Sequence, residues 1–328
     1  MKSSLRFLGI LGAVALLTSV ALHVGGIFIN TLGCELRDFR EGEYLSTCSH
    51  PVYQDYEHGA LFFDLEPSVV MKMRAAKVLF LGSSRTQAGW HTSVLQQHLS
   101  NEGVSFYMLG FGFDEKMPFA KALIERYRLS PAVLVINADP FFVNRTSAAS
   151  RPILERGFES RPGYLYRRGL SEVMKQLCSH DAGLRATRFC TGNRLTTMRN
   201  REDGTWRVPN WYNFEKDLVI YTGGPVSKRD EDAFFENATT FMENLDIPRS
   251  CVILTAVPSD VSSKQLVERL SARLDTEHVF PIIEGLKTYE GLHLQLESAR
   301  RWSQAFFAEA NDILHRCTSS STTMRLPG

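Results

Sequence analysis

The sequence predicts an α/β protein: a three-layer, doubly wound parallel sheet with a large insertion and an N-terminal transmembrane helix. Three observations support this fold class. From Lys77 onwards, apolar runs of strand length alternate with helical patterns. Residues 141–240 interrupt that alternation, and this segment is far longer than an ordinary loop. Near the N-terminus, an apolar stretch is long enough to cross a bilayer.

The core elements follow one another along residues 76–317, the expected catalytic domain. Strands are expected at Val78–Leu81, Ser105–Leu109, Val133–Asn137, Val252–Val257 and His278–Ile283. Helices are expected between and after them, notably at Pro118–Tyr127, Ser263–Leu274 and Ser298–Leu314. Because strands alternate with helices over short connections, we expect the strands to be parallel.

Residues 1–32 are expected to form a cytoplasmic tip and a membrane anchor. The 23 residues from 7 to 29 contain no Asp, Glu, Lys or Arg, and this length suffices to span a bilayer. Lys2 and Arg6 favour a cytoplasmic N-terminus, so the rest of the chain is expected on the periplasmic side of the inner membrane. A cleaved signal peptide, with Ser19-Val20-Ala21 as its cleavage site, is the alternative; the length of the apolar run favours the anchor.

Six cysteines lie beyond the predicted span, and an even number in an exported region indicates disulfides. Two pairs are close in sequence: Cys34 with Cys48, and Cys178 with Cys190. Cys251 opens a predicted strand and Cys317 ends the last predicted helix, so we expect both at the sheet edge opposite the active loops and predict that they are bonded. No Cys-x-x-Cys spacing is present, and neither a metal nor a cofactor is expected.

Two further segments lie outside the regular alternation. Residues 33–75 are polar and irregular, and we expect them to form a membrane-proximal stem. Residues 318–328 are rich in Ser and Thr, and we expect a disordered tail.

The insertion at 141–240 has an unusual composition. Between residues 145 and 207 it carries thirteen Lys and Arg against six Asp and Glu, interleaved with aromatic residues such as Trp206 and Trp211. Aromatic faces stack on sugar rings and arginines pair with carboxylate or phosphate, which suits an anionic glycan or a lipid head group. The same composition is equally well explained by a solvated basic surface that packs on the core through its aromatic residues. The net charge of the whole chain is only +1, which gives no reason to expect nucleic acid as a partner.

The first candidate for chemistry is the turn Gly82-Ser83-Ser84-Arg85. A parallel strand that leads into a helix places this turn at the carboxyl edge of the sheet, where α/β folds hold reactive groups. Gly82 permits a sharp turn, and a serine at a helix N-terminus lies beside N–H groups that can stabilise an oxyanion. Ser84 is the candidate nucleophile, with a plain helix cap as its alternative role. Arg85 either binds an anionic substrate group or pairs with a nearby carboxylate.

The second candidate group lies about two hundred residues later, in Tyr289-Glu290-Gly291-Leu292-His293, just before the last helical pattern. A serine hydroxyl attacks well only when a base removes its proton, and the base works best when a carboxylate fixes its tautomer. Ser84, His293 and Glu290 could supply these three roles.

These motifs resemble those of the SGNH (GDSL-like) hydrolase superfamily, and within it the membrane-anchored branch that acylates or deacylates envelope polymers. Gly82-Ser83-Ser84 stands where that family has Gly-Asp-Ser, and Glu290-Gly291-Leu292-His293 is similar to its Asp-x-x-His block. The resemblance covers roughly residues 76–140 and 245–315. It implies a nucleophile at Ser84, a base at His293 and an orienting carboxylate at Glu290, which is one methylene longer than the family residue.

The resemblance also implies an oxyanion hole. Tyr107-Met108-Leu109-Gly110 is similar to the second family block, so the N–H groups of Ser84 and Gly110 are the implied donors. The third block, normally Gly-x-Asn-Asp, is here Asn137-Ala138-Asp139-Pro140. Asn137 or Asp139 then takes the place of the family asparagine; a strand-ending turn is the alternative role of Asp139.

The expected function is O-acyl transfer, with acetyl as the expected group, or ester hydrolysis on a cell-envelope or exported polysaccharide through an acyl-enzyme. The expected partners are a glycan acceptor, the membrane and an integral-membrane acyl donor, with Arg85, Trp206 and Trp211 as substrate-binding residues. Two other classes stay open: a sulfotransferase-like enzyme that binds phosphate at residues 82–86, and a non-catalytic assembly or glycan-binding protein.

Overall fold

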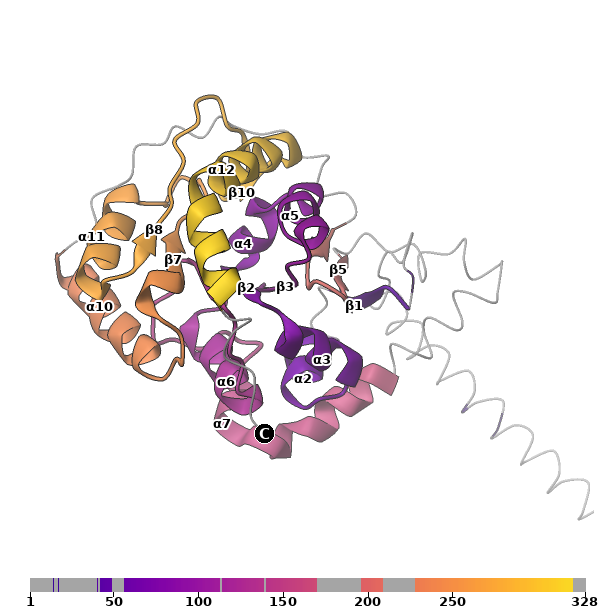
Figure 1. Ribbon diagram of the computed structural model, residues 1–328. Coiled ribbons are helices and arrows are strands. Elements are labelled where there is room, and N and C mark those ends of the chain that lie inside the picture. Colours follow the sequence, from indigo (N-terminus) through magenta and orange to yellow (C-terminus); the bar gives the residue numbers. More distant parts are fainter. Residues whose placement is uncertain are drawn as a thin grey trace, which may run out of the picture.

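A five-stranded parallel sheet forms the centre of the protein (Figure 1). The computed structural model describes residues 14, 17, 40, 42–48, 56–112, 114–138, 140–169, 196–208 and 228–320. The strands are β2 (Val78–Ser83), β3 (Phe106–Phe111), β4 (Val133–Asn137), β7 (Val252–Thr255) and β8 (Glu277–His278), in the spatial order β3-β2-β4-β7-β8. Every neighbouring pair is parallel. The predicted α/β class is confirmed.

The strand order creates a topological switch point between β2 and β4. The chain passes from β2 outward to β3 on one side, then crosses to β4 and continues to β7 and β8 on the other. Connections that leave in opposite directions open a crevice beyond the carboxyl ends of the two strands, which is where α/β proteins bind ligands. Ser84 follows β2 and Asn137 ends β4, so both residues lie at the switch point.

Helices cover both faces of the sheet and give it three layers. Side chains alternate along β2, so Val78 and Phe80 belong to one apolar cluster and Leu79 and Leu81 to the other. The first face packs against α5 (Thr92–His98) and α12 (Leu296–Ser320). The second packs against α3 (Pro67–Ala75), α6 (Met117–Tyr127), α10 (Lys228–Glu243) and α11 (Lys264–Leu274). Burial on both faces accounts for the uninterrupted apolar runs in the sequence.

Four of the five predicted strands and the predicted helices match the structure closely. The fifth predicted strand, His278–Ile283, is wrong, because only Glu277–His278 pairs with β7. The chain then approaches Pro281, which lacks an N–H group and cannot donate to a ladder. The last helix runs on to Ser320, so the first residues of the predicted disordered tail are helical.

The predicted stem at residues 33–75 is wrong for its described part. Strand β1 (Tyr44–Cys48) pairs antiparallel with β5 (Thr196–Asn200). Helices α2 (Tyr56–Phe62) and α3 bury Leu61, Val69 and Met73 in the core that covers the second face of the sheet. The folded unit therefore begins well before residue 76.

The described parts of the insertion pack on this unit. They include α7 (Arg151–Arg156), η2 (Gly157–Ser160), a helical stretch at 161–169 that runs past α2 and α3 in Figure 1, and the hairpin of β5 with β6 (Trp206–Arg207). Helix α10 begins within the predicted insertion, yet its Phe241 and Met242 belong to the main core. The insertion is therefore shorter than predicted.

No helix among the described residues is long and apolar enough to cross a membrane. The predicted anchor at residues 7–29 lies outside the described residues, apart from positions 14 and 17. It stays a prediction.

The predicted disulfide between Cys251 and Cys317 is confirmed. Cys251 ends η4 (Arg249–Cys251) directly before β7, and Cys317 lies in the last turns of α12. Both therefore lie at the edge opposite the carboxyl ends of the strands. The other two predicted pairs involve Cys34, Cys178 and Cys190, which lie outside the described residues.

Candidate active site

The turn between β2 and α4 (Ser84–Gly89) presents Ser84 at the carboxyl edge of the sheet. A side chain at Gly82 would lie 2.0 Å from Thr86 Oγ1, and the φ angle of Gly82 is 150°, so the position requires glycine. Ser83 is buried, and its Oγ accepts a hydrogen bond from the Arg85 N–H at 3.3 Å, which caps the helix. Ser84 is partly exposed. The two serines therefore divide the roles: Ser83 caps α4, and the Ser84 hydroxyl is left for chemistry.

Ser84 and His293 meet, although 209 residues separate them in the sequence. Ser84 Oγ lies 2.9 Å from His293 Nε2. His293 opens β10 (His293–Leu294), which forms a short antiparallel hairpin with β9 (Thr288–Tyr289). The distance is that of a hydrogen bond between a hydroxyl nucleophile and its base. The structure thus brings together the two residues expected to carry the chemistry.

The turn of the β9–β10 hairpin fixes the position of His293. Glu290 and Gly291 have φ angles of 56° and 72°, and the Leu292 N–H donates to the Tyr289 carbonyl at 3.0 Å, which closes a tight turn. The Asp260 N–H donates to the Gly291 carbonyl at 2.9 Å, and a side chain at Gly291 would lie 2.0 Å from Asp260 Oδ2. The loop after β7 therefore anchors the turn.

Glu290 is not brought to His293. It occupies the first central position of the turn, and its side chain is exposed. Within the part of the chain that the structure describes, no hydrogen bond or ion pair links its carboxylate to the imidazole. A side chain at the tip of a hairpin extends beyond the strands, so the spacing of three residues does not place Glu290 behind the base. The geometry gives no support to the predicted orienting role.

The surroundings of His293 keep its imidazole neutral. Burial, together with the positive charge of Arg85, lowers the pKa of His293 from its ordinary 6.5 to about 4. Arg85 is itself buried, and its Nη1 donates to Ser259 Oγ at 3.4 Å. At neutral pH His293 can therefore accept the Ser84 proton.

A second cation, which the sequence did not single out, lies near Arg85. Lys116 is buried at the start of α6 and pairs with Asp114, whose other partner is Arg145. Burial lowers the pKa of Lys116, and the charge of Arg85 adds to this effect. Arg85 and the Asp114-paired Lys116 therefore lie at the same edge of the sheet as Ser84.

Asn137 supplies a hydrogen-bond donor at the switch point. The residue is buried at the end of β4, and its Oδ1 accepts a hydrogen bond from the Val257 N–H at 3.1 Å, which fixes the side-chain amide. Its Nδ2 is also buried and has no acceptor among the described residues. Buried donors are nearly always paired. An available donor beside the nucleophile turn is well suited to receive an oxyanion.

Gly110, the predicted second oxyanion donor, lies within the central sheet. It pairs with Gly82 inside β3, and its carbonyl is already bound by two side chains. The last pair of the register joins Ser83 to Phe111, so Gly112 directly follows the end of β3, as Ser84 directly follows the end of β2. The N–H of Gly112 is therefore the better candidate donor.

Of the remaining predicted site residues, Trp206 is described, whereas Asp139 and Trp211 lie outside the described residues. Trp206 is partly exposed, and its Cη2 would lie 3.3 Å from a side chain at Gly112. An aromatic ring therefore lies next to Gly112, the candidate oxyanion donor. Two further residues, Gln87 and Arg199, bind the Gly110 carbonyl near the candidate site. They could not be predicted from the sequence, because only the fold brings them to Gly110.

Comparison with known proteins adds no relative: no family model, no curated protein and no solved structure matches the chain. In the described part of the chain, no group of three or more His, Cys, Asp or Glu side chains could hold a metal ion. The function is therefore argued from the geometry of the switch point and from the sequence motifs found there.

Proposed function

We propose that the protein is a serine-dependent O-acyltransferase or esterase that acts on hydroxyl groups of an envelope or exported polysaccharide. The observation that carries this proposal is the 2.9 Å contact between Ser84 Oγ and His293 Nε2 at the switch point of a doubly wound sheet. The resemblance of the two motifs to the SGNH superfamily supports the same chemistry and suggests the acyl group and the acceptor class.

The reaction would proceed through an acyl-enzyme. Ser84 Oγ attacks the carbonyl carbon of an acyl ester while His293 accepts the hydroxyl proton. The carbonyl oxygen becomes an oxyanion, which Asn137 Nδ2 and the backbone N–H groups of Ser84 and Gly112 can stabilise. When the intermediate collapses, the leaving oxygen departs with the proton from His293. A sugar hydroxyl or water then attacks the acyl-enzyme by the same steps in reverse.

The surroundings of Ser84 suggest the type of acceptor. Arg85 places positive charge beside His293, Lys116 lies near it in an ion pair with Asp114, and Trp206 offers an aromatic ring beside Gly112. These groups favour a glycan that carries carboxylate or phosphate groups. The predicted N-terminal anchor would keep the enzyme at the membrane, beside an integral-membrane acyl donor.

The alternative of a phosphate-binding loop at residues 82–86 has less support. That loop contains no lysine, and the alternative gives no role to the hydrogen bond between Ser84 and His293. A binding protein without activity would not need an available Asn137 donor beside a serine–histidine pair.

Single-turnover kinetics with an activated acetyl ester test the proposal. We expect a burst of one leaving group per active site, and we expect His293→Ala to abolish it. An anionic oligosaccharide that accelerates deacylation and emerges acetylated would identify a transferase, whereas an unchanged rate with release of acetate would identify an esterase. The absence of any burst or turnover in the unmodified protein would contradict both activities.

A further inference from the structure

Two buried side chains that take no direct part in the proposed reaction converge on one backbone carbonyl. The carbonyl of Gly110 in β3 accepts a hydrogen bond from Gln87 Nε2 at 3.0 Å and another from Arg199 Nη2 at 2.6 Å. Gly110 lies two residues before Gly112, the candidate oxyanion donor that follows the end of β3. The two contacts therefore fix the end of β3 next to the reacting groups.

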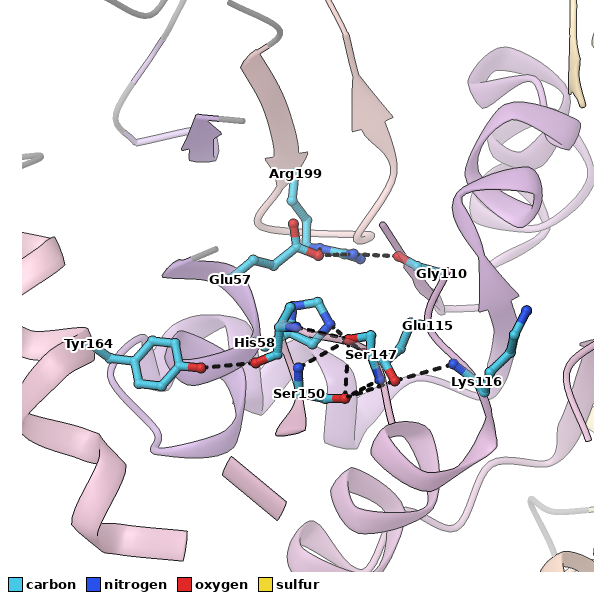
Figure 2. A network of polar contacts seen from close by, with 10 residues as sticks. Glu57, His58, Gly110, Glu115, Lys116, Ser147, Ser150, Tyr164 and Arg199 are labelled. Carbon is cyan, nitrogen blue, oxygen red and sulfur yellow. Dashed lines mark hydrogen bonds and ion pairs between the residues drawn. The ribbon is translucent and has the colours of Figure 1, made fainter. Parts of the chain in front are cut away.

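Arg199 reaches this point from β5, in the insertion (Figure 2). Its side chain is completely buried. Its guanidinium pairs with Glu57 of α2, with Nε donating to Oε1 at 2.8 Å, and its Nη1 donates to the Met108 carbonyl at 2.5 Å and the Gly204 carbonyl at 2.9 Å. It also lies over the ring of Phe111, 4.8 Å from the centroid. A buried charge is costly unless its donors are satisfied, and here the ion pair and the carbonyls satisfy them.

Gln87 makes the matching connection from the other side. It lies on α4, three residues after Ser84, and is buried. Its Nε2 donates to the carbonyls of Gly110 and Gly204, each at 3.0 Å, while its Oε1 accepts from the Trp206 N–H at 3.0 Å. One amide thus links the helix of the nucleophile to β3 and to the β5–β6 hairpin.

The position of β3 explains why the two hydrogen bonds from Gln87 and Arg199 to the Gly110 carbonyl, here called the clamp, matter. β3 is an edge strand of the central sheet, so its outer carbonyls and N–H groups have no neighbouring parallel strand to hold them. An oxyanion donor works only within about 2.7–3.1 Å of the developing charge. A displacement of about 1 Å at a reacting centre can cost about a hundredfold in rate.

We propose that Gln87 and Arg199 are positioning residues for the acyl-transfer step: by holding the Gly110 carbonyl, they set the Gly112 N–H beside Ser84. The inference rests on the proposed function. The insertion, which supplies Arg199, and α2, which supplies its partner Glu57, would thus help to position the oxyanion donor. Gln87 and Arg199 would act through Gly110 and would not touch the substrate.

The test uses the full-length protein and Gln87→Met, which keeps the size of the side chain but removes all three hydrogen bonds. With an activated acetyl ester, we expect kcat to fall about 10- to 100-fold while KM changes less than about twofold, since a loosened donor should cost less than the hundredfold or more of a deleted one. The affinity for a boronic acid, which forms a tetrahedral adduct on Ser84, should fall by a similar factor. Arg199→Lys keeps the positive charge that pairs with Glu57 but loses the guanidinium that binds several carbonyls at once. We expect the same fall in kcat and boronate affinity, with little change in KM.

A matched control separates positioning from stability. Val267→Ala opens a cavity in the core under α11, away from the clamp, and should lower the melting temperature with little effect on kcat or boronate affinity. The proposal is overturned if Gln87→Met leaves kcat and boronate affinity unchanged, or if Val267→Ala reproduces both losses at an equal drop in melting temperature. An unmodified protein that neither turns over the ester nor binds the boronate would remove the proposed function, and this inference with it.

Discussion

Two adjacent serines show how far function depends on a single position. Ser83 and Ser84 are chemically identical and both lie at the turn after β2, yet one is buried as a helix cap and the other meets His293. The backbone decides between them, because Gly82 lets the strand end sharply and Ser83 has the extended conformation of an N-cap. A sequence contains both hydroxyls but not the direction in which each points.

The pH dependence of the reaction should report the charge beside His293. Because burial and Arg85 lower its pKa to about 4, the acid limb of kcat/KM for an acetyl ester should lie near pH 4 rather than 6.5. Replacing Arg85 by Met removes a cation that disfavours the imidazolium, so the limb should move upward toward pH 6.5. Profiles measured between pH 3.5 and 8 check this, and an acid limb that stays in place in Arg85→Met would contradict it.

The oxyanion role of Asn137 can be separated from its structural role. Asn137→Asp keeps the Oδ1 that accepts from the Val257 N–H but replaces the Nδ2 donor with a second oxygen. We expect kcat to fall about a hundredfold or more, since one oxyanion donor is lost and a negative charge stands in its place. The buried carboxylate should also lower the melting temperature, so the loss of kcat is compared with that of Val267→Ala, which lowers the melting temperature away from the site. Thermal unfolding and ester turnover measured on the same samples separate a catalytic effect from a loss of stability. An unchanged kcat would exclude Asn137 as an oxyanion donor.

At the scale of the element, regular segments followed from the sequence and irregular ones did not. β4 was predicted to the residue, because its apolar run is bounded by Pro131 on one side and by Asn137 on the other. The helices α2 and α3 were mistaken for a stem, although Val69, Val70 and Met73 recur at helical spacing along α3. A closer count of that spacing would have predicted α3.

The β9–β10 hairpin shows the opposite case, in which the motif was found but its geometry was not. The spacing of Glu290 and His293 suggested a triad, yet positive φ angles at Glu290 and Gly291 turn the chain and leave the carboxylate exposed. Similarly, Gly110 and Gly112 are two residues apart, and only the register with β2 shows that Gly110 lies opposite Gly82, whereas Gly112 follows the last paired residue of β3.

The disulfide ties the last helix to its strand and should act on stability rather than on chemistry. Cys251 and Cys317 are 66 residues apart, and closing a loop of this length typically stabilises a fold by about 2–4 kcal/mol. Reduction should therefore lower the melting temperature, while the turnover rate at low temperature stays near that of the oxidised protein. The double variant Cys251→Ser with Cys317→Ser should behave like the reduced protein. Equal melting temperatures with and without reductant would contradict this account.

At the scale of the whole molecule, the site is assembled from segments that lie far apart in the chain. Ser84 and His293 meet at the switch point, where Asn137 ends β4. Gln87 and Arg199 converge on the Gly110 carbonyl, and Glu57 pairs with Arg199. The first group could be predicted, because strand ends of a doubly wound sheet meet at one edge. The second could not, because no local pattern connects a helix at 56–62 with a strand at 196–200.

The central claim is that Ser84 is a nucleophile activated by His293, and covalent labelling with a fluorophosphonate tests it most directly. We predict one adduct per molecule on the peptide that contains Ser84, slower labelling in His293→Ala and no adduct in Ser84→Ala. Ser83→Ala should lose about 1 kcal/mol of helix capping yet still be labelled. Labelling that persists in Ser84→Ala, or a wild-type protein that never reacts, would contradict the claim.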